Sequence, residues 1–155
     1  MLNLARLLVG RDRDALEIVQ QAYIRAWKGL KGFHGGNPRA WLLMSVRNTA
    51  RSWRRKRNPT FVQPGLAIPG AATNRETSLS PSEERIHQLQ DAFNSLSFEL
   101  REVVVLHEIE GWSYEQLALA LNVAVGTIVS RLNCARQRMR REMATVENRE
   151  LQNEL

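Results

Sequence analysis

Residues 113–140 constrain this chain most, because their pattern predicts two helices joined by a tight turn. Ser113 with Gln116 three positions later is a capping-box signature that starts a helix. Asn122 suits the left-handed conformation that ends a helix, and residues 125–127 then open a second one. A helix of this kind fits the major groove of B-DNA. The pattern favours a helix-turn-helix, and the alternative is an ordinary helical hairpin with a solvated basic face.

Both expected helices carry apolar residues at helical spacing, which predicts a buried inner face. These residues are Leu117, Leu121, Ile128, Leu132 and Ala135. The second helix turns polar side chains outward, where they could meet base edges and phosphates. The outward residues are Thr127, Ser130, Arg131, Asn133 and Arg136. Cys134 would lie on the same DNA-facing side, and packing against the interior of the domain is the alternative.

Charge is spread unevenly along the 155 residues, which carry 22 Lys and Arg against 16 Asp and Glu. Residues 1–60 hold 13 basic and 3 acidic side chains, residues 61–112 hold 3 and 8, and residues 113–155 hold 6 and 5. Both ends therefore suit a phosphate-bearing partner, whereas the middle does not. Charge alone leaves a solvated surface or a membrane-surface patch as alternatives.

Composition also indicates a compartment. The sequence has no run of about 18 apolar residues and no signal-peptide pattern, so we expect no membrane insertion and a cytoplasmic location. Cys134 is the single cysteine, which excludes an intramolecular disulfide and a cysteine-based metal cluster.

The distribution of loop-forming residues along the chain predicts two small domains. Residues 58–80 contain three of the five prolines, several Gly, Ser and Thr, and no sustained apolar period, so they read as a linker. We therefore expect an all-α protein with a helical domain at 1–57, a linker at 58–80, a helix-turn-helix domain at 81–145 and a tail at 146–155.

The first half also has a helical period. Its apolar positions follow the i, i+3, i+4, i+7 rule and predict one buried face, formed by Ile18, Val19, Ala22, Tyr23, Ala26, Trp27 and Leu30. Asp12 or Asp14 is available as its cap. Asn37-Pro38 then starts another helix, because Asn is a good N-cap and Pro suits the first helical position.

That next helix ends in a basic run at residues 54–57, and its outer face carries Arg47, Asn48 and Arg51. Basic residues interleaved with aromatics suit single-stranded nucleic acid, since bases stack on aromatic rings. Burial in the core is the alternative for Trp41 and Trp53, and we favour it for at least one of them.

Glu17, Gln20 and Gln21 form an uncharged-to-acidic cluster in a half that is otherwise strongly positive. Their spacing puts them on one helical face. DNA would repel this face at Glu17, so the cluster favours a protein surface over a nucleic-acid surface. The alternative is a merely solvated face.

Taken together, these residues resemble the extracytoplasmic-function (ECF) group of the sigma-seventy family, the bacterial factors that give RNA polymerase its promoter specificity. One match is ALEIVQQAYIRAW at residues 15–27, which looks like the region-two motif, and another is PRAWL at 38–42 followed by Arg47-Asn48. The strongest match is LREVV at 100–104, EGWSYE at 110–115, then VGT at 125–127, SRL at 130–132 and AR at 135–136, which is similar to region four. The resemblance covers nearly the whole chain.

The resemblance implies three sets of contacts. A face of the first long helix would contact the coiled coil of the polymerase clamp through Glu17, Gln20, Gln21 and Ile24. The loop at 33–37 and the following helix would capture a flipped-out base of the melted minus-ten element and hold nearby phosphates. The residues implied are Phe33, Asn37, Arg39, Trp41, Arg47, Asn48, Arg51, Arg54 and Arg55. The minus-thirty-five duplex would meet Thr127, Ser130, Arg131, Asn133 and Arg136.

The sequence departs from the family pattern at several places. The helix before residues 4–9 is usually longer, and Leu16 stands where an acidic residue is common. Val129 and Cys134 occupy recognition-helix positions that are often basic. Losing one bidentate Arg–guanine contact forfeits roughly 1–3 kcal/mol of base discrimination, so minus-thirty-five reading is expected to be relaxed or retuned.

We therefore predict an alternative sigma factor without catalytic residues or a cofactor, with core RNA polymerase, promoter DNA and an anti-sigma factor as partners. The departures keep a second hypothesis open: a sigma-like module that binds anti-sigma factors without driving transcription. An enzyme has little support, because the Asp12/Asp14 and Glu108/Glu110 pairs have i, i+2 spacing and do not share a helical face. The three histidines show no ligand spacing, so no metal site is expected.

Overall fold

The computed structural model describes residues 1–57 and 81–153, and the side chains of 1–57 and 83–144. The predicted linker at 58–80 lies outside the described residues. Within them every regular element is a helix, which confirms the all-α prediction. The chain divides into two compact units, Met1–Gln63 and Pro64–Leu155, and the division falls inside the predicted linker.

The first unit contains α1 (Leu2–Val9), α2 (Asp12–Lys28), a short 3-10 turn (Leu30–Gly32) and α3 (Pro38–Arg57). Gly10 ends α1 in the left-handed region, with φ of 78°, where a side chain would be strained. Asp12 and Asp14 lie in the first turn of α2, whose N-cap is Arg11, so neither aspartate caps the helix as expected. Their charges still favour this end through the helix dipole.

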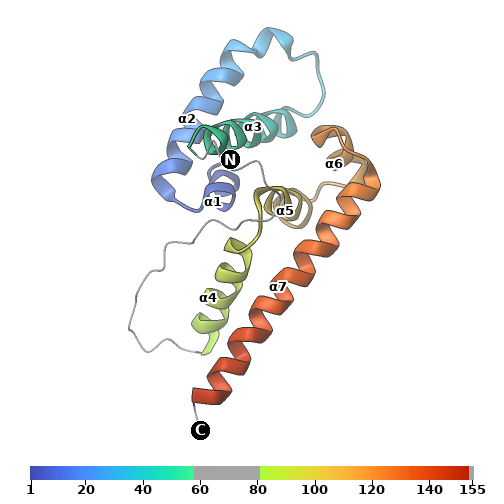
Figure 1. Cartoon of the computed structure of the whole chain (residues 1–155). Helices are drawn as coiled ribbons and strands as arrows, with labels where there is room; N and C mark the ends of the chain where they lie inside the picture. The colour runs from blue at the N-terminus through green and yellow to red at the C-terminus, as the bar shows by residue number, and fades with distance from the viewer. Residues whose placement is uncertain (58–80, 154–155) are drawn as a thin grey trace. The chain divides into compact units, whose positions relative to one another are not determined.

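The core of this unit lies where the three helices pack together, and small residues on α2 let α3 approach closely. Large side chains fill the rest of the space. The fully buried apolar residues are Leu4, Ala5, Leu8, Ala15, Ile18, Ala22, Leu43, Val46 and Ala50. The end of α2 extends beyond this packed region before the loop turns back to α3 (Figure 1).

The second unit contains α4 (Pro81–Asn94), α5 (Phe98–Val104), a π-helical turn (Val105–Ile109), α6 (Tyr114–Leu121) and α7 (Val125–Asn153). The helix α7 is continuous through residues 146–153, part of the segment predicted as a tail. Both α4 and α5 pack on α7, and α6 packs near its start (Figure 1). The predicted inner face is buried at Leu117, Leu121, Ile128, Leu132 and Ala135.

Candidate nucleic-acid interface

A hollow of about 300 Å³ opens between α2 and α3 of the first unit. Its lining is partly apolar and partly polar: Arg25, Ala26, Trp41, Met44, Ser45, Asn48 and Thr49. Phe33, from the loop before α3, packs on Trp41 with 5.3 Å between ring centroids. The aromatic pair therefore brings the predicted loop and helix together beside Asn48.

Hydrogen bonds fix the polar wall of this hollow. Arg47 Nη1 donates to Asn48 Oδ1 at 2.9 Å, and Arg25 Nη1 donates to Thr49 Oγ1 at 3.4 Å. The Thr49 hydroxyl in turn donates to the Ser45 carbonyl at 2.8 Å, and Ser45 Oγ donates to the Ala22 carbonyl at 3.1 Å. The wall is thus tied to the backbone of both α2 and α3, which holds it in one arrangement.

The other predicted minus-ten residues differ in exposure. Asn37, Arg39, Arg51 and Arg55 are exposed, and Arg54 is half-buried. Asn37 Oδ1 accepts the backbone N–H groups of Arg39 and Ala40, which confirms its predicted role as the N-cap. The expectation that Arg47 lies on the outer face of α3 is wrong, because packing between the helices leaves only 6% of its surface exposed. Its position suits it to holding Asn48 better than to reaching a phosphate.

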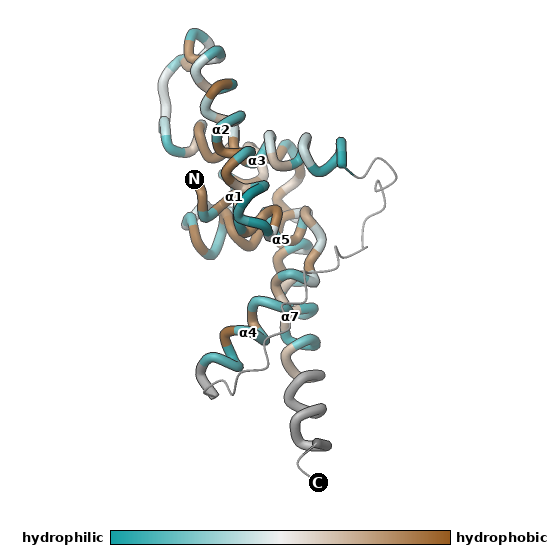
Figure 2. Tube along the Cα trace, turned by 90° about the vertical axis from the view of Figure 1, so that its left-hand side faces the viewer, coloured by the Kyte–Doolittle hydropathy of each residue, from teal (hydrophilic) through white to brown (hydrophobic). Residues whose placement is uncertain are grey.

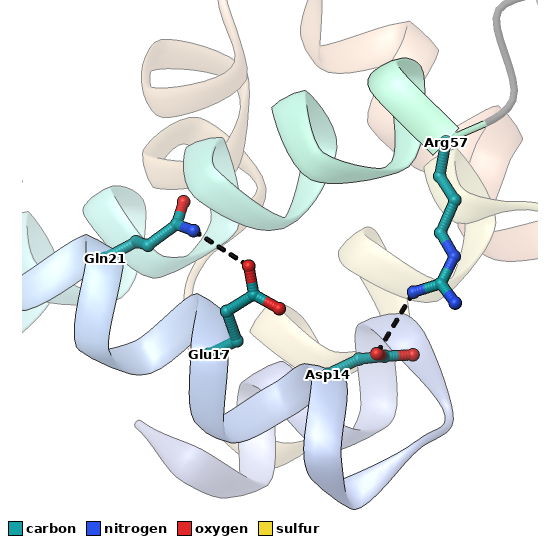
Figure 3. Close-up of polar contacts among 4 residues, drawn as sticks. All are labelled: Asp14, Glu17, Gln21 and Arg57. Atoms are coloured by element: carbon teal, nitrogen blue, oxygen red, sulfur yellow. Dashed lines mark hydrogen bonds and ion pairs between the residues drawn. The ribbon is translucent and has the colours of Figure 1, made fainter.

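The basic end of α3 is the most hydrophilic part of that helix (Figure 2). Arg57 is turned back toward α2, where its Nη1 lies 3.2 Å from Asp14 Oδ1 (Figure 3). The guanidinium also lies over the Trp53 ring, 4.9 Å from its centroid. Trp41 and Trp53 are both half-buried, so neither is a core residue of the kind we favoured.

The cluster of Glu17, Gln20, Gln21 and Ile24 lies on the outer side of α2. Gln21 Nε2 donates to Glu17 Oε1 at 3.0 Å, which places both polar ends side by side (Figure 3). Glu17, Gln20 and Ile24 are exposed and Gln21 is half-buried. All four side chains therefore border one accessible helical face.

The predicted apolar face of α2 is only partly buried. Ile18, Ala22 and Ala26 are in the core, but Tyr23 and Leu30 are about half exposed and Trp27 is 77% exposed. The expectation of one continuous buried face is therefore wrong. Leu16 and Ile24 are exposed as well, so α2 carries four large apolar residues at the surface, and Leu30 in the 3-10 turn after it is a fifth. We call Leu16, Tyr23, Ile24, Trp27 and Leu30 the α2 apolar surface.

In the second unit, the predicted helix-turn-helix is present with its expected capping. Gln116 N donates to Ser113 Oγ at 3.2 Å, while Ser113 N donates to Gln116 Oε1 at 2.9 Å. The two bonds form the complete capping box that the sequence indicated. Asn122 adopts a left-handed conformation with φ of 54°, which ends α6 and allows the turn into α7.

The predicted minus-thirty-five residues fall into two groups. Ser130 and Asn133 are exposed and Thr127 is half-buried at the start of α7. The two arginines instead meet carboxylates: Arg131 Nη1 lies 3.6 Å from Glu102 Oε1, and Arg136 Nη2 donates to Glu108 Oε1. The hydrogen bond from Arg136 lowers the pKa of Glu108, and the same bond raises the pKa of Arg136. Both arginines are therefore neutralised in part.

Neither acidic partner was expected from the sequence. Glu102 is 1% exposed, although it stands in a charged, helical segment that a pattern reads as surface. Glu108 was interpreted as solvated surface, and it is half exposed but paired. Arg25 and Thr49 were also missed at the hollow. Their spacing on α2 and α3 offered no signal until the two helices were placed side by side.

Of the two placements considered for Cys134, the structure supports packing against the interior of the domain and not the DNA-facing one. Its side chain is half-buried and packs against a cluster formed by Leu96, Leu100 and Ala135. Val129 is also half-buried. The same cluster includes Phe93 of α4, so this side of α7 is covered by α4 and α5. The absence of a basic residue at position 134 is therefore explained by packing inside the domain.

Two features of the described residues bear on other functions. No group of three or more His, Cys, Asp or Glu is placed to hold a metal ion in that part of the chain. Among the same residues, no single helix is both long and apolar enough to cross a bilayer, and only α6 taken together with residues 125–144, which are bent against each other, has the necessary length and composition.

Comparison with known proteins covers both units. Residues 1–60 match the family described as Sigma-70 region 2, and residues 86–139 match Sigma-70, region 4. The chain is 32% identical over 133 residues to the ECF RNA polymerase sigma factor EcfG of Rhodopseudomonas palustris, covering 85% of this chain and 72% of that protein. The chain belongs to the ECF sigma factors. Region 2 of this ECF sigma factor thus holds α1 to α3, and region 4 holds the helix-turn-helix.

Two further comparisons agree with this family. The ECF RNA polymerase sigma factor SigE of Mycolicibacterium smegmatis is 32% identical over 149 residues, which is 92% of this chain but 56% of that protein. A solved structure of the sigma factor RpoE in complex with the anti-sigma factor NepR, from Bartonella quintana, has a TM-score of 0.69 and 29% identity. The matched region covers 92% of this ECF sigma factor and 89% of the chain in the solved structure.

Proposed function

We propose that this chain is an alternative sigma factor that binds core RNA polymerase and directs promoter recognition and melting in the cytoplasm. The observation that carries the proposal is the presence in one chain of both sigma regions, each with an accessible candidate contact surface. Bond-making chemistry would belong to the polymerase. The chain would supply positioning and strand separation.

The two units would divide this work. The cluster at Glu17, Gln20, Gln21 and Ile24 would bind the polymerase clamp, since an acidic and amide-rich face suits protein better than DNA. The hollow would capture one base of the melted minus-ten element with Asn48 and the Phe33–Trp41 pair. The exposed basic residues Arg39, Arg51 and Arg55, with Arg54 beside them, would hold phosphates.

The minus-thirty-five duplex would meet the start of α7. Thr127, Ser130 and Asn133 are accessible for hydrogen bonds to base edges or phosphates. Arg131 and Arg136 would have to exchange their carboxylate partners for phosphate or base acceptors. This exchange makes their contribution smaller than that of unpaired arginines.

In vitro transcription with core polymerase on a library of genomic fragments tests the proposal directly. We expect transcripts from a small set of promoters that depend on the added chain. The variant Asn48→Ala should reduce open-complex formation more than closed-complex binding, because its partner is exposed only on melting. Equal losses in both steps would assign Asn48 to the fold instead.

The clamp contact is tested separately. Gln20→Ala combined with Gln21→Ala should weaken binding to core polymerase while the helical circular-dichroism signal stays intact, because substitutions on an exposed helix face cost little stability. Unchanged affinity for polymerase would remove the clamp assignment from this face.

A second candidate is a sigma-like module that binds an anti-sigma factor without driving transcription. The carboxylate-paired Arg131 and Arg136 favour it, since their engagement weakens the DNA face. The solved complex of a similar sigma factor with NepR also makes an anti-sigma partner reasonable for the main proposal. A chain that binds core polymerase weakly and yields no specific transcript from the library would favour this candidate.

A further inference from the structure

The two arginines of α7 that meet carboxylates have very different partners. Arg136 and Glu108 both lie at the surface, and each side chain is well exposed. Glu102 belongs to α5 and its side chain is 1% exposed, while 27% of the Arg131 side chain reaches solvent. We call Arg131–Glu102 the inner pair and Arg136–Glu108 the outer pair.

Burial of the carboxylate decides whether an arginine can leave it. In an exposed pair, water solvates the carboxylate again when the arginine turns to another anion, so little is lost. A buried carboxylate has no such water, and removal of its cation is strongly destabilising. Exchange of a carboxylate for a DNA phosphate is therefore open to Arg136 and strongly disfavoured for Arg131.

The inner pair also joins two helices that pack on each other, α5 and α7. Arg131 lies in the second turn of α7, and its Nη1 is 3.6 Å from Glu102 Oε1. Successive residues of an α-helix are turned by about 100° around its axis. A helix that is held at Arg131 is therefore held in rotation, and this rotation sets where the exposed Ser130 and Asn133 point.

We propose that Arg131 is a positioning residue for minus-thirty-five recognition. It keeps its ion pair with Glu102 when promoter DNA binds, it holds the rotation of α7, and it does not contact DNA. The inference rests on the proposed function. It predicts that base reading depends on Glu102, whose burial keeps it from reaching DNA itself. Of the two arginines, Arg136 is the one that exchanges its carboxylate for phosphate.

The test is a double-variant cycle on the holoenzyme formed from core polymerase and the full chain. Salt-titrated fluorescence anisotropy measures its affinity for a promoter duplex found by the transcription library. The same measurement is made on that duplex with a scrambled minus-thirty-five element. The ratio of the two affinities reports base reading, and the slope of log affinity against log salt reports phosphate contacts.

Arg131→Met and Glu102→Gln should each lower the affinity ratio about tenfold, the scale of one lost base contact. The double variant should lower it by a similar factor and not by the product of the two losses, because both changes break the same pair. The salt slope should stay unchanged in Arg131→Met and in the double variant. Glu108→Gln makes the same change in the outer pair and is the matched control, which should leave the ratio unchanged.

Thermal melting followed by circular dichroism shows whether each variant folds. Arg131→Met is the variant at risk, because it leaves the buried Glu102 beside an uncharged side chain. The double variant removes the buried charge, and Arg131→Lys keeps a cation beside it, so both keep the test valid. Arg131→Lys should retain most of the affinity ratio.

The outcomes separate this inference from the function on which it rests. A salt slope that is shallower by about 0.9 in Arg131→Met or in the double variant would show that Arg131 contacts a phosphate, which overturns the inference alone. Additive losses in the double variant, or an undiminished ratio in folded Glu102→Gln, would also overturn it and leave promoter binding standing. An unmodified holoenzyme that binds both duplexes equally overturns minus-thirty-five recognition itself, and the inference with it.

Discussion

Arg136 of α7 meets Glu108 across the surface of the second unit, and Arg131 of the same helix meets the buried Glu102. A phosphate that approaches α7 must compete with these carboxylates for the same N–H donors. Both Arg136 and Glu108 are well over a third exposed, so solvent screens the pair and its contribution to stability is small. Its effect on DNA affinity is the larger consequence.

Glu108→Gln should therefore strengthen binding to duplex promoter DNA. Removing the charge releases Arg136 for phosphate, and one added phosphate contact steepens the slope of log affinity against log salt by about 0.9. Salt-titrated fluorescence anisotropy measures the slope. Glu142→Gln, an exposed site on α7, removes the same charge and is the matched control. Equal slopes for the two variants would show that Glu108 does not restrain Arg136.

Cys134→Arg should destabilise the second unit, because the new side chain would be forced against the Leu96–Leu100–Ala135 cluster. Overpacking of this kind costs about 1–3 kcal/mol, and burial of charge adds to it. Chemical denaturation measures the loss, and Cys134→Ser controls for the loss of the thiol. A Cys134→Arg chain of normal stability with tighter DNA binding would instead put this side chain on the DNA face.

At the scale of elements, α2 shows what a sequence period can and cannot decide. Periodicity identified the helix and its buried residues Ile18, Ala22 and Ala26. It could not separate them from Tyr23 and Trp27, because an apolar face covered by the same chain and one left at the surface have the same spacing. The difference in burial arises because the end of α2 extends beyond the helices that cover the rest of it (Figure 1).

Local signals were predicted more reliably than pairings between elements. The Ser113–Gln116 capping box, the Asn122 turn and the Asn37 cap depend on residues within a few positions of one another. The burial of Arg47, by contrast, depends on how the helices pack in three dimensions. The hollow at Asn48 was implied by family resemblance, but its Arg25 and Thr49 wall required the packed helices.

Trp27→Ala should leave stability within about 0.5 kcal/mol of the unmodified chain, because substitutions on an exposed surface cost little. If the α2 apolar surface binds polymerase, the loss of an aromatic anchor should weaken that binding by at least about tenfold, or ~1.4 kcal/mol. Calorimetric titration with core polymerase measures the change. Ile86→Ala, a similarly exposed apolar site on α4, is the control. Unaltered affinity after Trp27→Ala would exclude Trp27 from the contact with polymerase.

At the scale of the whole molecule, the chain is two small cores, each of modest size. Domains of this size bury a limited share of their surface, so each core is sensitive to a single cavity. The division into Met1–Gln63 and Pro64–Leu155 also implies that unfolding need not be two-state.

Leu43→Ala should lower the melting temperature of the first unit only. Leu43 is completely buried, and truncation of a buried leucine costs about 2–5 kcal/mol. Differential scanning calorimetry should resolve two transitions and show one of them shifted. Leu117→Ala, buried in the second unit, should shift the other. A common shift of both transitions in either variant would show that the units unfold together.

The exposed indole of Trp27 also gives the chain an optical label of its own. Indole emission moves to shorter wavelength when water is removed from the ring, and Trp27 is far more accessible than the half-buried Trp41, Trp53 and Trp112. A partner that covers α2 would therefore change mainly the emission of Trp27. Subtracting the signal of Trp27→Phe would isolate that change, so the docking of α2 could be timed by stopped-flow spectroscopy on unlabelled protein.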